Sequence, residues 1–161
     1  MENKEFAGFW IRFWANFIDG LVLMAPMFVV NAIVYQQVLG MSKMDYEFMM
    51  IEQNSSDMYY VYTEPFEIMV WTMPITFILS LLFCSILTAS NWQGTVGKRL
   101  LGLKVVDLEG NRLGFAHSLG RFFAYIPSGL ILYLGYIMVG VTEKKQGLHD
   151  MIAKTYVIRT K

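Results

Sequence analysis

Three long stretches without Asp, Glu, Lys or Arg constrain this chain more than any other feature of its sequence. They are residues 20–42, 68–97 and 122–142, and the second is strongly apolar only as far as about Ala89. A helix rises about 1.5 Å per residue, so each stretch reaches the roughly 20 residues that cross a hydrocarbon core. A chain of 161 residues has too little remaining sequence to cover three such helices in a soluble core. The stretches therefore predict an integral membrane protein in contact with a lipid bilayer.

The composition excludes several other classes of protein. Hydrophobic residues make up 55% of the chain and charged residues only 16%. Thirteen basic and thirteen acidic residues cancel, so the charge balance predicts no nucleic-acid partner. The single cysteine, Cys84, cannot form an internal disulfide or a cysteine metal cluster. We expect no cofactor and no metal site.

The charged residues predict how the chain is threaded through the bilayer. Segment 43–67 holds six acidic residues and one base, whereas bases are concentrated in 91–121 and 143–161. Because Lys and Arg in short loops stay on the cytoplasmic side, we expect segment 43–67 outside and both termini in the cytoplasm. The predicted organisation is one membrane domain with span 17–39, acidic outer loop 40–67, span 68–90, basic cytoplasmic loop 91–121, third apolar segment 122–142 and basic tail 143–161.

The third apolar segment has two interpretations. A full crossing by residues 122–142 would put the basic tail outside, against the charge rule. Pro127, Ser128 and Gly129 lie in its first half, and proline removes a backbone donor while glycine relaxes the chain. A break there would let the segment re-enter and leave both its ends inside. We expect a broken, re-entrant or interfacial segment, with a third span as the alternative.

Residues 101–115 are less apolar than the stretches on either side. Val105 and Val106 lead to the turn sequence Glu109-Gly110-Asn111, which is followed by a short second arm. This pattern indicates a β-hairpin on the cytoplasmic side. The predicted fold class is an all-α integral membrane protein with two full transmembrane helices, a third hydrophobic segment and this short hairpin.

Arg12, Asn16 and Asp19 form a polar stripe at the start of the first span. Their spacings of four and three place them on one face of a helix. A carboxylate at the depth of Asp19 is costly unless it pairs, faces protein or meets water. One interpretation is structural, with Arg12 reaching toward lipid headgroups and pairing with Asp19 through Asn16. The other is that Asp19 faces a polar cavity and binds a cation or relays a proton.

His149 and Asp150 form the second notable polar pair. They follow the bases Lys144 and Lys145, and His117 is the only other histidine. The chain lacks the clustered ligands of a zinc site, and no nucleophile with an adjacent base is visible, so we expect neither a metal site nor catalytic residues. A local helix cap or an ion pair with a basic neighbour is the favoured role of Asp150.

Three segments of the sequence resemble the RDD family of bacterial membrane proteins. They are Phe9-Trp-Ile-Arg-Phe-Trp-Ala-Asn-Phe-Ile-Asp19, Gly94-Thr-Val-Gly-Lys-Arg-Leu-Leu-Gly-Leu-Lys-Val-Val-Asp107 and Leu148-His-Asp-Met-Ile-Ala-Lys-Thr-Tyr-Val157. The resemblance places the arginine and the two aspartates that give the family its name at Arg12, Asp19 and Asp150. It departs from the family at Lys154, where a glycine is usual. The resemblance implies a role in transport, because cation/proton exchange has been proposed for some members.

Two hypotheses for function follow. The first is a small transport-related protein, oligomeric because two or three spans enclose little volume, that moves a monovalent cation, protons or a small ligand. The second is a non-transporting accessory or regulatory subunit that binds another membrane protein and uses its charges as a structural clamp. An enzyme is not expected. The candidate site residues are Arg12, Asn16, Asp19 and Asp150, supported by His149, Lys98 and Arg99.

Overall fold

The computed structural model describes residues 5–47, 66–130 and 134–160, so most of the predicted acidic loop lies outside the described residues. The chain divides into two compact units. Unit 1 consists of Met1–Val22 and Ser80–Lys161, and unit 2 consists of Leu23–Leu79. Each unit is described by itself below.

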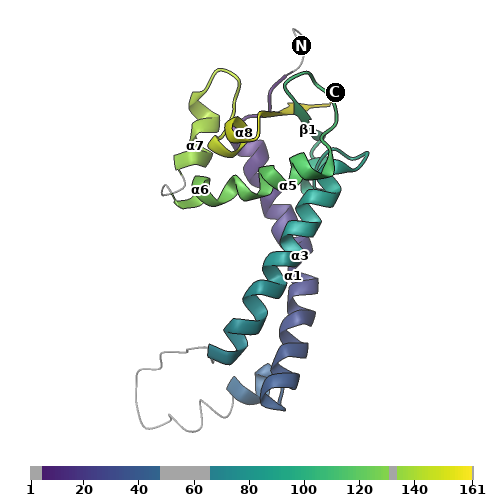
Figure 1. Cartoon of the computed structure of the whole chain (residues 1–161), viewed down its shortest axis with the longest axis vertical. Helices are drawn as coiled ribbons and strands as arrows, with labels where there is room; N and C mark the ends of the chain where they lie inside the picture. The colour runs from purple at the N-terminus through teal and green to yellow at the C-terminus, as the bar shows by residue number, and fades with distance from the viewer. Residues whose placement is uncertain (1–4, 48–65, 131–133, 161) are drawn as a thin grey trace. The chain divides into compact units, whose positions relative to one another are not determined.

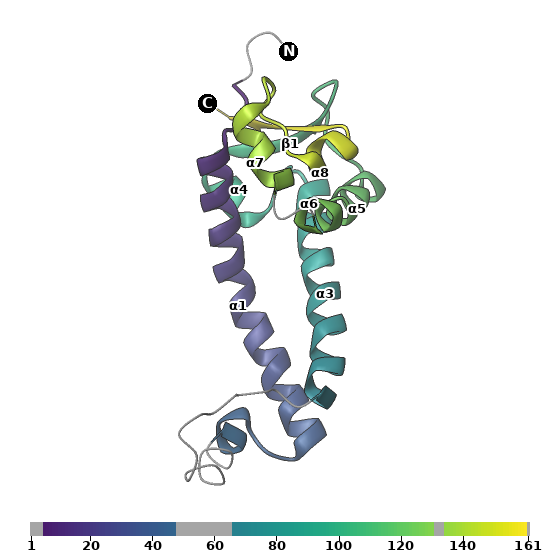
Figure 2. The same ribbon diagram turned by 90° about the vertical axis from the view of Figure 1, so that its left-hand side faces the viewer.

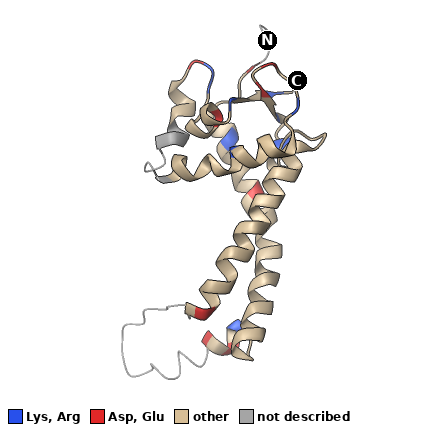
Figure 3. Cartoon of the chain, viewed as in Figure 1, with Lys and Arg blue, Asp and Glu red and all other residues tan. Residues whose placement is uncertain are grey.

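Two long helices, α1 (Phe9–Leu39) and α3 (Phe66–Ala89), carry the first two apolar stretches (Figure 1). At about 1.5 Å per residue both exceed the roughly 30 Å of a hydrocarbon core. Only 11% of the most apolar window of each helix is buried, whereas a soluble core helix would be mostly covered. Figure 3 shows uncharged turns along most of both helices. Among the described residues these are the two helices long and apolar enough to span a membrane.

Unit 2 contains the later part of α1, from residue 23, and the first part of α3, as far as residue 79. Val34 and Tyr35 pack with Ile68 to form its buried cluster. The hydroxyl of Thr72 donates to the carbonyl oxygen of Ile68 at 2.9 Å, and that of Thr76 donates to the carbonyl of Thr72 at 2.8 Å. These bonds to the preceding helical turn give both hydroxyls an acceptor within their own helix.

Unit 1 is organised around an antiparallel pair of strands, β1 (Leu103–Asp107) and β2 (Thr155–Arg159), with Val105 opposite Val157. Residues 5–7 lie along β2 as well, because the N–H of Ala7 donates to the carbonyl of Val157 at 2.9 Å. The chain therefore enters α1 beside its own tail. One buried apolar cluster of this unit consists of Ala7, Ala15, Leu103, Val105, Leu113 and Val157, and a second consists of Val106, Tyr156 and Ile158.

The predicted hairpin at residues 101–115 is present only in part. The turn forms, because the Asp107 carboxylate accepts the N–H groups of Glu109 at 2.9 Å and Asn111 at 2.8 Å. The second arm makes a single isolated bridge, between Val106 and Arg112. The main partner of β1 is instead the tail strand β2, which offers five consecutive paired residues and a buried apolar face.

The third apolar segment lies in short helices. These are the end of α5 (Phe115–Phe123), then α6 (Tyr125–Leu130) and α7 (Leu134–Val141), and residues 131–133 lie outside the described part. Pro127 and Gly129 lie inside α6 and not at a break, which corrects the predicted position of the interruption. Pro127 is the third residue of α6, where a backbone N–H has no helical partner to lose. Whether the segment re-enters or spans stays a prediction.

The short helix α8 (Leu148–Ile152) completes unit 1 and leads directly into β2. It contacts α5, α6 and α7, and a turned view shows these helices gathered beside the strand pair (Figure 2). Unit 1 thus brings the start of α1, the loop after α3 and the tail together, and each of these carries some of the predicted site residues.

Candidate functional site

Asp150 on α8 lies between two buried arginines from distant parts of the chain. Nη1 of Arg12 on α1 forms an ion pair with Oδ2 of Asp150. On the other side, Nη2 of Arg121 on α5 lies 2.5 Å from Oδ1. The Asp150 side chain is fully buried, and the two arginine side chains are 8% and 4% exposed. A charged group that is this buried is stabilised only when it is paired, and here one carboxylate pairs with two guanidinium groups.

Local backbone structure positions this cluster. Asp150 is the third residue of α8, and its Oδ2 accepts the N–H of Gly147, the residue before the helix, at 3.1 Å. Arg12 extends the network, because its Nε donates to the carbonyl of Ala7 at 2.9 Å and its Nη2 to that of Lys145 at 2.5 Å. Arg12 therefore fastens the N-terminal segment and the loop before α8 to the same carboxylate.

The cluster also sets the charge states of its members. Burial alone would raise the pKa of Asp150, but Arg121 and Arg12 together hold it below its ordinary value. Burial would lower the pKa of Arg121, but Asp150 and Tyr125 together raise it above its ordinary value, so that guanidinium stays charged. Burial is the main reason that the pKa of His149 is lowered to about 3; Asp150 acts to raise it, and Arg121 and Arg12 act to lower it. His149 is therefore neutral at neutral pH.

Asp19 has separate partners on α4 (Val96–Leu100). One carboxylate oxygen accepts the hydroxyl of Thr95, the residue that precedes α4, and the other accepts the N–H of Gly97 at 2.7 Å. Nζ of Lys98 lies 3.9 Å from the carboxylate. The contact requires glycine, because a Cβ at position 97 would overlap the carbonyl oxygen of Ala15. Both oxygens of Asp19 thus accept hydrogen bonds from the protein itself.

The predicted pairing of Arg12 with Asp19 is wrong. Both residues share a face of α1, but Arg12 binds the tail through Asp150 while Asp19 binds the loop after α3. Asn16, which lies between them, accepts a hydrogen bond from Lys98 Nζ at 3.1 Å. The Arg12 side chain is buried against the tail. The reason is that two segments distant in sequence, the tail and the loop after α3, lie against α1 and offer nearer partners. A direct contact between Arg12 and Asp19 would have required both side chains to lean along the helix.

The supporting residues divide into two groups. Lys98 is buried in the Asp19 contact, whereas Arg99 beside it is exposed. His149 lies against the cluster, with Nε2 3.3 Å from Asp150 and its ring 4.3 Å from the ring of Tyr125. Both favoured roles of Asp150, a local cap and an ion pair with a basic residue, are present, although the bases are Arg12 and Arg121 and not the adjacent lysines.

Arg121 and Thr95 were not identified from the sequence. Arg121 donates to the hydroxyl of Thr155 as well as to Asp150. A signal for it existed, because His117, Ser118 and Arg121 have the spacing of one helical face on α5. His117 on that face contacts the carbonyl of Ala153 at 2.5 Å, so this polar face packs on the tail.

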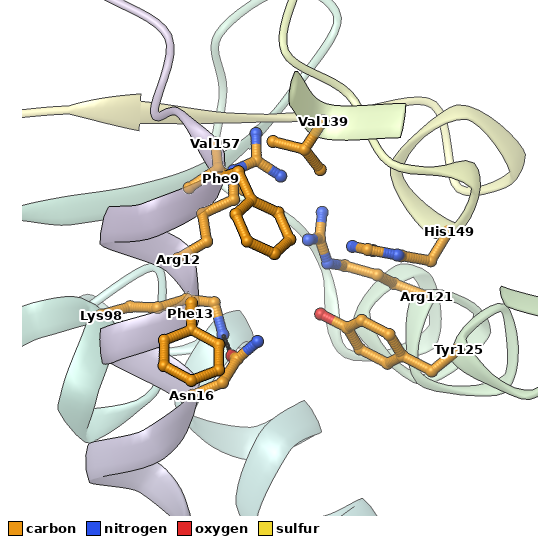
Figure 4. A pocket seen from close by; sticks show the side chains of 10 residues that line it. All are labelled: Phe9, Arg12, Phe13, Asn16, Lys98, Arg121, Tyr125, Val139, His149 and Val157. Atoms are coloured by element: carbon orange, nitrogen blue, oxygen red, sulfur yellow. Dashed lines mark hydrogen bonds between the residues drawn. The ribbon is translucent and has the colours of Figure 1, made fainter. Parts of the chain in front are cut away.

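A cavity of about 290 Å³ adjoins both sets of contacts (Figure 4). Arg121 and Tyr125 point into it from one side, and Phe9 and Phe13 of α1 form the opposite wall. Within the described part of the chain, no group of three or more His, Cys, Asp or Glu residues could hold a metal ion. The lining residues are Phe9, Arg12, Phe13, Asn16, Lys98, Arg121, Tyr125, Val139, His149 and Val157.

These features define a membrane protein with two long apolar helices and a polar unit whose buried charges pair with one another. The sequence profile of the RDD family matches residues 6–154, and the chain belongs to this family. The uncharacterized protein YxaI of Bacillus subtilis (strain 168) is 41% identical over 152 residues, which cover 94% of this chain and 96% of the relative. The uncharacterized membrane protein YteJ of the same organism is 29% identical, covering 99% of this chain and 84% of the relative. No solved structure matches the chain.

Proposed function

We propose that this protein is a non-transporting accessory or regulatory subunit of the membrane, which binds another membrane protein and whose charged residues act as a structural clamp. The observation that carries the proposal is that the carboxylates of Asp19 and Asp150 both bind other groups of the protein. Asp150 is paired with two arginines, and Asp19 accepts hydrogen bonds with both oxygens. A carboxylate that binds Na⁺ or relays a proton needs an oxygen that is accessible to the ion.

A transport-related role, the other hypothesis, keeps one supporting observation, which is the cavity beside the clamp. Cation or proton transport is the less favoured form, because three cationic side chains and no carboxylate line that cavity. The proposal includes no catalysis. None of the ten lining side chains is a serine, threonine or cysteine that His149 could activate as a nucleophile.

The proposal places both termini on the cytoplasmic side and segment 43–67 outside. The charge rule assigns the basic regions to the cytoplasm. Pairing of the N-terminal segment with β2, through Ala7 and Val157, supports a tail on the same side as the N-terminus. In a variant with Cys84 replaced by serine, a cysteine introduced at Thr160 should react with an impermeant thiol reagent only after permeabilisation. Labelling of intact cells would refute this orientation.

Reconstitution into liposomes separates the two functions. We expect no Na⁺ or H⁺ flux above that of protein-free vesicles under an imposed gradient. We also expect Asp19→Asn to lower protein abundance and thermal stability, because two donors from α4 would face a neutral amide. Glu109→Gln removes an exposed acid and is the matched control. Flux that disappears in Asp19→Asn while that variant stays folded would establish transport and overturn the proposal.

A further inference from the structure

The cavity in unit 1 combines apolar walls with cationic groups. Phe9, Phe13 and Val139 supply apolar and aromatic surface, while Arg12, Lys98 and Arg121 supply positive charge. Its volume of about 290 Å³ lies at the lower end of the range for small-molecule sites, roughly 300–1,000 Å³. Such a lining fits a ligand with an apolar part and an anionic part better than a bare ion.

The charges around the cavity do not cancel. Three cations line it, and the two carboxylates paired with them, Asp19 and Asp150, leave one positive charge in excess. His149 is neutral and adds no charge. In a site with few water molecules an uncompensated charge acts over a longer range than it does in bulk water. The cavity therefore attracts an anion and repels a cation.

Two hydrogen-bond donors remain for such an anion. Asn16 uses its Oδ1 to accept from Lys98, and Figure 4 shows its side-chain nitrogen on the cavity side of this bond. Lys98 donates to Asn16 at 3.1 Å and to Thr95 at 3.3 Å, and its Nζ lies 3.9 Å from Oδ2 of Asp19, beyond hydrogen-bond distance, so that carboxylate does not take the third ammonium proton. An amide nitrogen and a lysine on neighbouring elements are a suitable pair for a phosphate oxygen.

The cavity adjoins a stretch of α1 that carries exposed aromatic side chains. Phe9, Arg12, Phe13 and Asn16 recur at three- and four-residue spacing and form the helix face that lines it. Phe13, at the edge of this face, is 47% exposed, and the neighbouring Trp10 and Trp14 are more exposed still. Aromatic side chains of this kind collect at the headgroup depth of a bilayer. A ligand that enters past Phe13 would come from the lipid interface.

We propose that this cavity binds an anionic phospholipid, with its phosphate beside Asn16 and Lys98 and the start of an acyl chain along Phe9, Phe13 and Val139. Arg12 and Arg121 contribute through their charge, because their hydrogen bonds are already directed at protein acceptors. The phosphate chemistry is shared with free inorganic phosphate, but the apolar walls and the exposed aromatic side chains beside the cavity favour the lipid. This inference does not depend on the accessory role, since lipid binding is measured without a partner.

The test uses the full chain purified in a non-ionic detergent and titrated with short-chain lipids, with bound molecules counted by native mass spectrometry. Dihexanoyl phosphatidylglycerol should bind at least tenfold more tightly than dihexanoyl phosphatidylcholine. Lys98→Gln keeps a donor for Asn16 but removes the charge, and it should weaken phosphatidylglycerol binding about tenfold, or about 1.4 kcal/mol. Arg99→Gln removes the adjacent exposed charge from the same helix and should change the affinity less than twofold.

A second variant keeps the test decisive if Lys98→Gln does not fold. Asn16→Asp changes an exposed side chain and places a carboxylate next to Lys98. It should abolish the preference for phosphatidylglycerol over phosphatidylcholine and leave the unfolding temperature unchanged. Equal binding of the two lipids would show that the cavity takes only an apolar chain and would overturn the proposal. An equal loss in Arg99→Gln would reduce the effect to general surface charge. Competition by inorganic phosphate at the affinity of the lipid would reassign the site to a free anion.

Discussion

Replacing Asp150 by Asn should destabilise the protein more than any other single change in its charge. Asn has nearly the same shape and can still accept the N–H of Gly147, so the substitution removes the negative charge and little else. Arg12 and Arg121, both buried, would then face one another without a counter-ion. Removing one partner of a buried ion pair costs about 3–5 kcal/mol, and here a single loss affects two arginines.

The matched comparison is the exposed ion pair between Arg159 and Glu5. Their atoms lie 3.2 Å apart, but the side chains are 43% and 57% exposed, and such a pair contributes about 0–1 kcal/mol. We therefore expect Glu5→Gln to change the free energy of unfolding by less than about 1 kcal/mol. In a chain of this size 1 kcal/mol corresponds to about 2–4 °C, so Asp150→Asn should lower the unfolding midpoint by about 10 °C.

Heating the two purified variants in the same detergent while following intrinsic tryptophan fluorescence measures this difference. The parent chain contains four tryptophans and neither substitution touches one. If Asp150→Asn and Glu5→Gln lower the midpoint by the same small amount, the buried cluster does not stabilise the fold, and the clamp that underlies the proposed function is refuted.

Two further predictions concern pH and backbone packing. Because burial lowers the pKa of His149 to about 3, the unfolded chain binds a proton between about pH 6.5 and 3 that the folded chain does not. The free energy of unfolding should thus be highest above pH 6.5 and fall by about 1.4 kcal/mol per unit of pH below it. If the unfolding midpoint of His149→Gln changes with pH as that of the parent does, His149 is not the cause of this pH dependence. Gly97→Ala should lower the free energy of unfolding by about 1–3 kcal/mol, because the new Cβ would overlap the Ala15 carbonyl. Gly120→Ala is the control: its Cβ meets no atom within 4 Å, so it should be neutral or slightly stabilising in the same thermal assay.

The long helices could be predicted from the sequence because their signal is local. A run of about 20 apolar residues is sufficient to indicate a span, whatever the rest of the chain does. The span predicted at 17–39 lies within α1, which begins at Phe9. The shared face of Arg12, Asn16 and Asp19 is likewise a local consequence of helical spacing.

The pairing of these residues could not be predicted in the same way. Arg12 and Asp150 are 138 positions apart, and Asp19 and Gly97 are 78 apart. Helical spacing says which side chains share a face but not which distant segment returns to it. The partner of β1 was missed for the same reason, since the turn after Asp107 offered a nearby arm while the actual partner is the tail. Arg121 was noted only as a loop base, because its burial follows from the packing of α5 on α8.

The polar contacts of Arg12 and Asp19 on α1 explain why an apolar chain keeps so many buried charges. Arg12 and Asp19 are seven residues apart, which is about 10 Å along the helix, and each binds a different segment of unit 1. A hydrophobic contact could hold those segments to α1, but it would not distinguish the tail from the loop after α3 at a surface that is apolar on every side. Opposite charges at fixed positions make that distinction, and their mutual pairing lets the lipid-facing turns stay uncharged. Among the described charged residues of unit 1 that form these pairs, one positive charge is not balanced by a carboxylate, and it lies at the cavity. The cavity is therefore the place to test for a bound ligand.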